Sequence, residues 1–179
     1  MDHADHVNLI RPANLEQGGS WADLGAGSGA FTLALREVLS AATTIHAVDK
    51  DKSSLEQLKR SYQARFGGLE NLQTQVGDFS RSINLPPLDG IIAANSLHYF
   101  KDRVKVLEHI KTFLKPKGKL IVIEYNVDSG NPWVPYPFTF QTFAKLAKGA
   151  GYSEPRLLAT HPSSFLREFY SALTFKADS

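Results

Sequence analysis

The stretch Asp23-Leu24-Gly25-Ala26-Gly27-Ser28-Gly29-Ala30 decides how this chain folds. It follows a short run at residues 21–24 that predicts a strand, and it leads into apolar residues at helical spacing over about 30–40. Glycine permits the tight turn between such elements and lets a ligand approach the backbone beside the helix N-terminus. The glycines and the final alanine also fit the G-x-G-x-x-G/A pattern of dinucleotide-binding turns, although a plain strand-to-helix turn satisfies it too.

Strands and helices alternate along most of the remaining sequence. Runs rich in apolar and β-branched residues predict further strands at 44–48, 72–76, 89–95 and 120–125. Apolar residues at helical spacing predict helices at 51–66, 104–114 and 139–148, the middle one closed by Lys115-Pro116-Lys117-Gly118. This order predicts an α/β fold with three layers, in which helices cover both faces of a doubly wound, Rossmann-like and mostly parallel sheet.

The two ends of the chain depart from this pattern. Residues 156–160 and 168–175 predict two strands with only 161–167 between them. A parallel crossover needs a dozen or more residues, so the last strand is expected to run antiparallel to the strand before it. We expect a single domain at 18–179, preceded by an N-terminal arm at 1–17. The arm begins with a segment expected to be a flexible terminus that binds a metal only adventitiously, through Asp2, His3, Asp5 and His6.

Composition excludes several classes of protein. The chain of 179 residues has no cysteine, which excludes a disulfide framework, a thiolate metal site and a cysteine nucleophile. Lys and Arg exceed Asp and Glu by 20 to 18, and the net charge of +2 is too small to predict nucleic-acid binding. The basic residues at 101–119 are interrupted by Asp102 and Glu108 and are expected to form a solvated face. No run of about 18 apolar residues and no signal peptide is visible, so a cytoplasmic protein without a membrane span is expected.

Three acidic residues distinguish between ligands that the glycine turn could bind. Asp49 ends the second predicted strand, where a carboxylate accepts hydrogen bonds from both ribose hydroxyls. It could instead cap the next helix, a role open also to Asp51. Asp23 lies two residues before Gly25, where an acid repels a pyrophosphate and suits a ligand with a cationic end, such as S-adenosylmethionine. Asp78 follows the third strand and is placed to accept the adenine amine, with turn formation as its alternative.

The chain resembles the class I S-adenosylmethionine-dependent methyltransferases over residues 18–175. The resemblance rests on ordered segments that match the family's motifs, namely Trp21–Gly29, Ala47–Asp49, Val76–Phe79, Asp89–Phe100 and Leu114–Leu120. In the last of these, Lys117 replaces the first glycine of a Leu-x-Pro-Gly-Gly turn. The resemblance implies a Rossmann-like fold that ends in an antiparallel hairpin. It also implies methyl transfer, with S-adenosylmethionine as cofactor and S-adenosylhomocysteine as product.

The same resemblance implies where the cofactor and the acceptor bind. The expected cofactor-binding residues are Asp23, Gly25, Ala26, Gly27, Asp49, Lys50, Asp78, Phe79 and Asn95. His98, just beyond the fourth strand, is either a general base or acceptor-binding residue, or a plain loop histidine. The prolines and aromatics of 126–140 predict an apolar lid over a small, partly apolar or aromatic acceptor. The residues expected to contact that acceptor are Tyr99, Trp133 and Tyr136.

Three alternatives stay open at this point. An RNA or protein methyltransferase would need a recognition surface, and no segment of the sequence indicates one. A nicotinamide-dependent oxidoreductase, using NAD or NADP, is disfavoured by Asp23 and Asp78. A non-catalytic adenosylmethionine-binding protein would keep the same glycines and acids without turnover. The oligomeric state and the atom that is methylated are not predicted.

Overall fold

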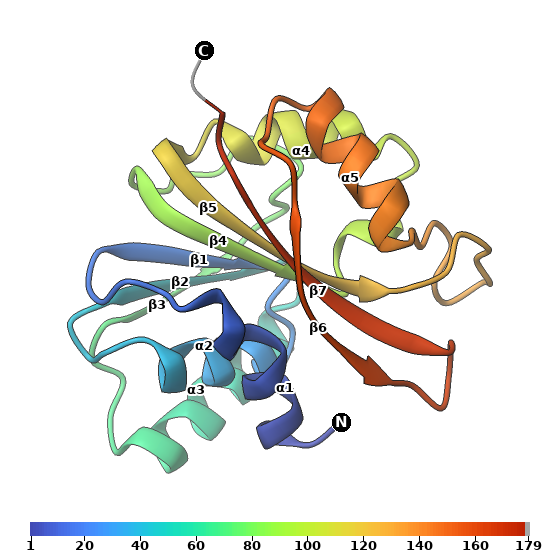
Figure 1. Ribbon diagram of the computed structural model, residues 1–179. Helices are drawn as coiled ribbons and strands as arrows, with labels where there is room; N and C mark the ends of the chain where they lie inside the picture. The colour runs from blue at the N-terminus through green and yellow to red at the C-terminus, as the bar shows by residue number, and fades with distance from the viewer. Residues whose placement is uncertain (178–179) are drawn as a thin grey trace.

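Seven strands form one twisted sheet in the computed structural model, which describes residues 1–177 (Figure 1). The strands are β1 (Ser20–Leu24), β2 (Thr44–Asp49), β3 (Leu72–Val76), β4 (Leu88–Ala94), β5 (Leu114–Tyr125), β6 (Arg156–Pro162) and β7 (Glu168–Phe175). The α-helices of the described residues are α1 (His3–Ile10), α2 (Ala30–Val38), α3 (Lys52–Phe66), α4 (Arg103–Lys111) and α5 (Phe140–Gly149). Two 3₁₀ turns are also present, η1 (Arg11–Ala13) and η2 (Leu97–Tyr99). Residues 178 and 179, with which the predicted domain ends, lie outside the described residues.

The strand order across the sheet is β3-β2-β1-β4-β5-β7-β6. The strands from β3 to β5 are parallel, whereas β7 runs antiparallel to both β5 and β6. The chain therefore leaves β1 toward one edge of the sheet and returns through β4 toward the other edge. This confirms the predicted doubly wound, Rossmann-like α/β fold and its antiparallel C-terminal strand.

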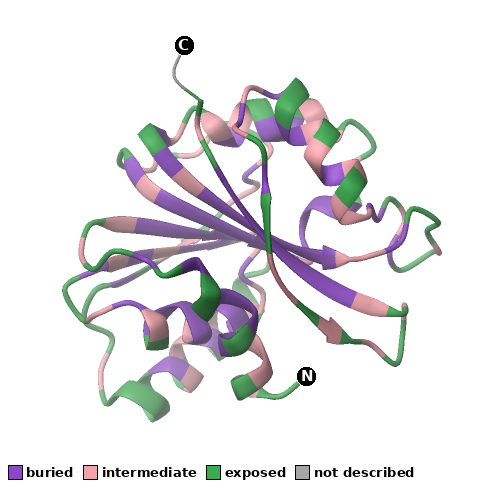
Figure 2. Cartoon of the chain, in the orientation of Figure 1, coloured by how far each residue is buried: buried purple, intermediate pink, exposed green. Residues whose placement is uncertain are grey.

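Helices cover both faces of the sheet and complete the three layers (Figure 1). On one face, α1, α2 and α3 bury apolar side chains such as Leu9, Leu35 and Leu58 in one hydrophobic cluster. On the other face, α4 and α5 contribute Leu107 and Phe143 to a second cluster. The central strands between these clusters are buried along most of their length (Figure 2), and each fully buried Leu or Phe contributes about 1.5–3 kcal/mol. None of the helices within residues 1–177 is both long and apolar enough to cross a membrane.

The N-terminal residues form a helix, so the expectation of a flexible terminus is wrong. Asp2 caps α1 through a capping box with Asp5, which satisfies two free N–H groups at the helix start. The helix packs against α2 and β6 through three buried side chains, Val7, Leu9 and Ile10. His3 is also engaged, because its Nε2 lies 2.6 Å from Glu37 Oε2. Asp2 and Asp5 therefore stabilise the start of the helix, and His3 links it to Glu37.

Residues 114–118 begin β5 and do not close a helix, which corrects a second expectation. Helix α4 ends at Lys111, and Leu114 already pairs with Leu88 of β4. Lys115 lies on this strand, with its Nζ 2.9 Å from both carboxylate oxygens of Asp89. The helical spacing of Leu114 therefore reflects its burial beside α4, in the same apolar cluster, and not membership of that helix.

Candidate active site

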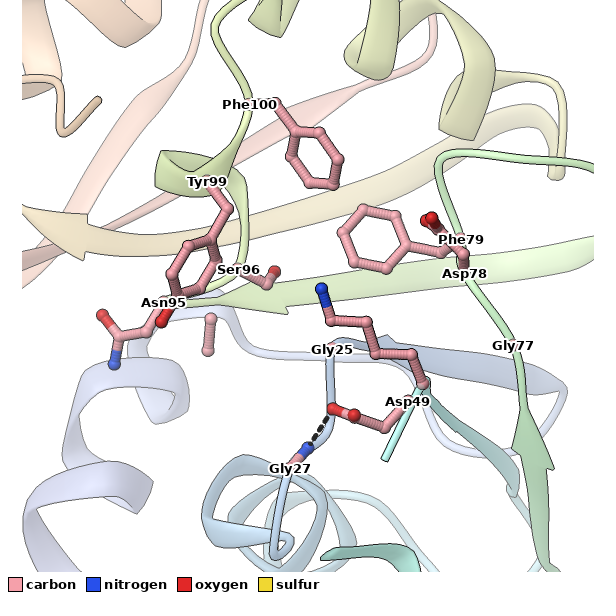
Figure 3. Close-up of a pocket in the computed structure, with 12 residues that line it drawn as sticks. Gly25, Gly27, Asp49, Gly77, Asp78, Phe79, Asn95, Ser96, Tyr99 and Phe100 are labelled. Carbon is pink, nitrogen blue, oxygen red and sulfur yellow. Dashed lines mark hydrogen bonds between the residues drawn. The ribbon is translucent and has the colours of Figure 1, made fainter. Parts of the chain in front are cut away.

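A cavity of about 310 Å³ opens at the carboxyl ends of β1, β2, β3 and β4 (Figure 3). The connections that leave β1 and β4 diverge here toward opposite edges of the sheet, and ligands of doubly wound sheets bind at such a point. The volume falls within the usual range of ligand pockets, about 300–1,000 Å³. The cavity is lined by Gly25, Gly27, Asp49, Lys50, Gly77, Asp78, Phe79, Ala94, Asn95, Ser96, Tyr99 and Phe100.

The glycine turn between β1 and α2 forms one wall of the cavity. Gly25 and Gly27 have φ angles of +81° and +53°, in the left-handed region that glycine adopts most readily. A Cβ atom on Gly25 would lie 2.6 Å from Cβ of Ser96, so no side chain fits there. The N–H groups of Gly25 and Ala26 both donate to the carbonyl oxygen of Val48, at 2.9 and 3.0 Å. The turn is thus fixed against β2, with bare backbone facing the cavity.

Asp49 lies at the end of β2 and binds the glycine turn directly. Its Oδ2 accepts a hydrogen bond from the N–H of Gly27 at 2.8 Å, and its Oδ1 accepts one from the N–H of Asp51 at 2.8 Å. Asp51 caps α3, so the alternative of Asp49 as the helix cap is wrong. A carboxylate has about four acceptor sites, and Asp49 therefore retains capacity for a ligand's hydroxyl groups. The neighbouring Lys50 also lines the cavity, as predicted.

Asp78 and Phe79 line the cavity after β3, and Asp78 also forms a turn. Its Oδ1 accepts hydrogen bonds from the N–H of Ser80 at 3.0 Å and from Ser80 Oγ at 2.6 Å. These bonds, led by that from the hydroxyl, lower the pKa of Asp78 and keep it ionised. The Phe79 ring meets that of Phe100 edge to face, with 5.5 Å between the ring centres. Turn formation and ligand binding by Asp78 are therefore compatible, since the same carboxylate stabilises the turn and lines the cavity.

Asp23 and Ala26 do not line the cavity, in contrast to the other predicted cofactor-binding residues. Asp23 is buried, and its Oδ2 accepts a hydrogen bond from Thr32 Oγ1 at 2.6 Å. Burial raises the pKa of Asp23 to about 7, with a smaller contribution from the charge of Asp49. Ala26 lies in the hydrophobic cluster beneath the turn. Contact of either residue with a cofactor stays a prediction.

Two buried polar atoms beside the cavity have no hydrogen-bond partner among the described residues. They are the side-chain atoms Oδ1 of Asn95 and Oγ of Ser96, the two residues that follow β4 (Figure 3). Asn95 also has a φ angle of +52°, a conformation that few residues other than glycine adopt readily. Buried polar groups without partners are costly, so these atoms indicate where a polar ligand would supply the missing hydrogen bonds.

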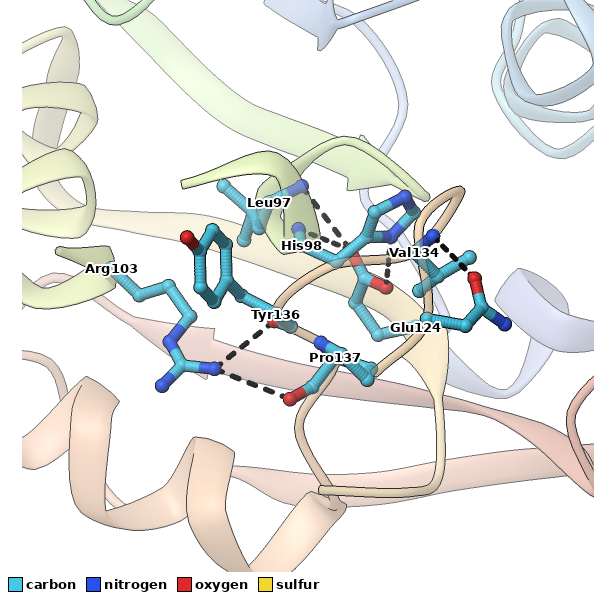
Figure 4. A network of polar contacts seen from close by, with 8 residues as sticks. Leu97, His98, Arg103, Glu124, Val134, Tyr136 and Pro137 are labelled. Atoms are coloured by element: carbon cyan, nitrogen blue, oxygen red, sulfur yellow. Dashed lines mark hydrogen bonds and ion pairs between the residues drawn. The ribbon is translucent and has the colours of Figure 1, made fainter. Parts of the chain in front are cut away.

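His98 forms a buried pair with Glu124, a residue that sequence reasoning missed (Figure 4). His98 Nδ1 lies 2.8 Å from Glu124 Oε2, and the two side chains are 2% and 0% exposed. The other carboxylate oxygen accepts the backbone N–H groups of Leu97 and His98, at 3.1 and 3.2 Å. A carboxylate only accepts, so Nδ1 donates to Glu124, and in a neutral ring the lone pair is then on Nε2. Within residues 1–177 that Nε2 is buried and has no partner.

The sequence does contain a signal for Glu124. It is the single charged residue in the run from Leu120 to Tyr125, which otherwise reads as a strand covered on both faces. A carboxylate in such a strand is almost never fully buried unless it is paired, so its presence predicts a partner from a neighbouring strand end. The partner is His98, which follows the adjacent strand β4.

The expected lid, residues 126–140, forms the connection between β5 and α5 and the first residue of α5, and it contacts His98 through Tyr136. The N–H of Tyr136 donates to the carbonyl oxygen of His98 at 2.9 Å, which brings Tyr136 beside the pair. Tyr99 lines the cavity, and its ring centre is 4.3 Å from that of His98. Trp133 is 71% exposed and does not line the cavity. The structure thus brings His98, Tyr99 and Tyr136 together and leaves Trp133 apart.

Comparison with known families identifies the kind of protein to which this site belongs. A family model described as a methyltransferase domain matches residues 15–154. This chain belongs to the S-adenosylmethionine-dependent methyltransferases. S-adenosylmethionine is therefore the cofactor, and the oxidoreductase alternative is excluded. The cavity suits it, because bare glycine backbone, the Asp49 carboxylate and the unpartnered atoms of Asn95 and Ser96 are available to a ligand with polar groups at both ends.

Individual proteins resemble parts or all of this methyltransferase. The highly reducing polyketide synthase PKS2 of Leptosphaeria maculans is 30% identical over 129 residues, which cover 63% of this chain and 5% of that protein. The YcgJ protein of Bacillus subtilis has a TM-score of 0.78 at 14% identity, covering 99% of this chain and 100% of that one. Human N-acetylserotonin methyltransferase in complex with S-adenosylmethionine has a TM-score of 0.66 at 20% identity, covering 98% and 52%. The two structural similarities show the fold, and this chain spans only a small part of the polyketide synthase.

Replacing Asp49 by alanine is expected to weaken S-adenosylmethionine binding by roughly 10–100-fold, because hydrogen bonds to a charged group contribute about 1.5–3 kcal/mol. Calorimetric titration measures this change. Thermal melting gives a second reading, since a hundredfold excess over Kd stabilises the wild-type protein by about 2.7 kcal/mol, equivalent to roughly 5–10 °C here. NAD and NADP at the same concentration are expected to leave the midpoint unchanged.

Two further variants isolate the role of Asp49. Asp49→Asn keeps an oxygen acceptor for the Gly27 N–H but removes the charge, so it separates support of the turn from ligand binding. Asp51→Ala removes the cap of α3 and is expected to lower the ligand-free midpoint without changing the Kd. Unchanged affinity in a folded Asp49→Ala protein would remove Asp49 from the cofactor site.

Proposed function

We propose that the protein transfers a methyl group from S-adenosylmethionine to a small molecule and that His98 is the general base. One observation carries this proposal, namely the buried His98–Glu124 pair beside the cavity with Nε2 unpartnered within the described residues. A histidine that only filled space in a loop would have no need of a fully buried carboxylate. A general base has such a need, because the carboxylate orients the ring and stabilises the imidazolium that forms when the ring takes a proton.

Different residues of the site would bind the cofactor, exclude water and accept the proton. S-adenosylmethionine, when bound, supplies a methyl group activated for in-line displacement. The glycine turn, Asp49 and Asp78 would hold the cofactor, and the Phe79 and Phe100 rings exclude water from that side of the cavity. His98 Nε2 takes the proton that the acceptor loses during attack, and the Glu124 side chain keeps the ring in place through its contact with Nδ1. The acceptor is therefore a molecule whose attacking atom carries a proton.

The net charge of the protein and the aromatic side chains next to His98 favour a small acceptor over RNA or protein. The net charge of +2 offers little attraction to a nucleic acid. Tyr99 and Tyr136 provide partly exposed aromatic surface next to His98, which suits a compact, partly apolar molecule. The name of one similar protein, a polyketide synthase, refers to small-molecule chemistry and supports the same choice, whereas three other curated relatives are named ribosomal protein L11 methyltransferases. We also propose a cytoplasmic location, since the chain lacks cysteines for the disulfides common in exported proteins.

Turnover with a panel of acceptors tests this proposal. The full chain is incubated with S-adenosylmethionine and phenols, hydroxy acids, amines or 1,3-dicarbonyl compounds, and S-adenosylhomocysteine is quantified by mass spectrometry. We expect acceptor-dependent product with at least one class whose attacking atom carries a proton. Binding of the cofactor without turnover of any small molecule, together with methylation of an added RNA or protein fraction, would overturn the small-molecule proposal.

A further inference from the structure

We infer that Arg103 is a positioning residue, which holds residues 136–138 against His98 and so keeps the base enclosed and oriented. This inference rests on the proposed function, because it concerns the same histidine. Arg103 is the first residue of α4, and the sequence marks it only as one of several basic residues in that region. In the folded protein it reaches across to the connection between β5 and α5 (Figure 4).

The Arg103 side chain makes three contacts with this connection. Its Nη1 donates to the carbonyl oxygen of Tyr136 at 3.0 Å and to that of Pro137 at 3.2 Å. Its guanidinium carbon lies 5.5 Å from the ring centre of Phe138, a buried side chain. Its Nε is buried as well, with no partner in the part of the chain that the structure describes. A guanidinium placed this way fixes the course of three consecutive residues.

The sequence of the connection explains why it needs such a contact. Pro135 and Pro137 have no N–H group, so Tyr136 carries the only backbone donor of these three residues. That donor is used on the carbonyl oxygen of His98, at 2.9 Å. The connection forms no strand or helix here, and its carbonyl groups must therefore find donors elsewhere. Arg103 provides them.

These contacts link Arg103 to the base through one peptide segment. The Tyr136 N–H binds the His98 carbonyl, the Tyr136 carbonyl binds Arg103, and the His98 N–H binds Glu124. Removal of the guanidinium frees two carbonyl groups and loosens the segment that lies over His98. Lysine replaces it only in part, because an ammonium could donate to both carbonyl groups but has no planar face to lie over the Phe138 ring.

Hydrogen–deuterium exchange at the imidazole Cε1 position tests this inference, because its rate follows solvent access to each histidine. The full chain is incubated in deuterium oxide without any acceptor, and the exchange of His98 is read by mass spectrometry of its peptide. We expect slow exchange of His98 in the wild-type protein. In Arg103→Ala we expect it to be at least about tenfold faster, comparable to the loss of one hydrogen bond to a charged group.

Matched controls distinguish a local effect from general loosening. His46 in β2 and His109 in α4 serve as internal references and should keep their wild-type rates. Lys105→Ala removes another basic side chain of α4 and should leave His98 unchanged, whereas Arg103→Lys should give an intermediate rate. A wild-type rate for His98 in folded Arg103→Ala, or equal acceleration of all three histidines, would overturn the inference. If Arg103→Ala does not fold, Arg103→Met decides, because methionine keeps an apolar stem and removes every donor, and a wild-type His98 rate there contradicts the role of the guanidinium.

The exchange test is independent of the proposed function. It needs neither turnover nor a known acceptor, so a protein that methylates no small molecule can still show the effect of Arg103 on His98. Conversely, an enzyme with full small-molecule activity and unchanged exchange in Arg103→Ala would keep its proposed function and lose this positioning residue. Where an acceptor is found, Arg103→Ala should lower kcat while the Kd for S-adenosylmethionine stays within about twofold, since the guanidinium supports the base and not the cofactor.

Discussion

Replacing His98 by alanine is expected to lower kcat by about 10²–10⁴-fold, the usual contribution of a general base. The Kd for S-adenosylmethionine should change by less than about twofold, because His98 does not line the cavity that we propose for the cofactor. Steady-state kinetics with an acceptor from the turnover panel gives the first quantity, and calorimetric titration gives the second. An unchanged rate would show that alignment alone suffices and that His98 is a structural residue.

Glu124→Gln provides the partner experiment, since it removes charge but keeps size. An amide can turn either its oxygen or its NH2 group toward His98 Nδ1. The carboxylate oxygen that faces the backbone N–H groups of Leu97 and His98 must remain an acceptor, which turns the amide NH2 toward the ring. Nδ1 then becomes the acceptor and the proton moves to Nε2, so the base is lost although the ring stays in place. We expect a rate loss close to that of His98→Ala, with cofactor binding intact.

The fold could be predicted because its signals are local. The glycine turn cannot accept other residues, since Gly25 packs against Ser96 and all three of its glycines lie at positive φ. The five strands that precede the C-terminal hairpin carry continuous or alternating apolar runs, and the helices between them carry apolar residues at helical spacing. Asp49 and Asp78 were predicted to line the site because Asp49 ends β2 and Asp78 follows β3, at the same edge of the sheet.

The rest could not be predicted because it depends on contacts between distant segments. Glu124 is 26 residues from His98 in sequence, and only the pairing of β4 with β5 brings them together. The course of residues 114–118 is decided by Leu88, which offers a strand partner at the point where a helix had been expected to end. Helix α1 depends on the surface of α2 and β6, because eight residues with mixed polarity do not form a stable helix alone.

The pKa of Asp23 also depends on contacts that the sequence does not show, and it gives a second large expected effect. The sequence predicted a carboxylate beside the cavity, whereas the structure buries it against Thr32 and raises its pKa to about 7. Between about pH 4 and pH 7 the folded protein keeps this proton and the unfolded chain loses it. The folded state therefore binds more protons in that range, and the free energy of unfolding falls as pH rises. A rise from 3.8 to about 7 corresponds to roughly 4 kcal/mol.

Asp23→Asn is expected to remove this loss of stability, because asparagine has no proton to release. Urea unfolding of both proteins at several pH values measures the difference between them, in which the titration of all other groups cancels. That difference should shift in favour of Asp23→Asn by roughly 4 kcal/mol between about pH 3 and pH 8 and stay constant below about pH 3, where the wild-type carboxyl is neutral in both states. Thr32→Val removes the hydrogen bond that lowers the pKa of Asp23, so its stability should continue to fall above pH 7. A difference that does not vary with pH would mean that Asp23 has the same pKa in the folded and unfolded states, which would contradict the effect of its burial.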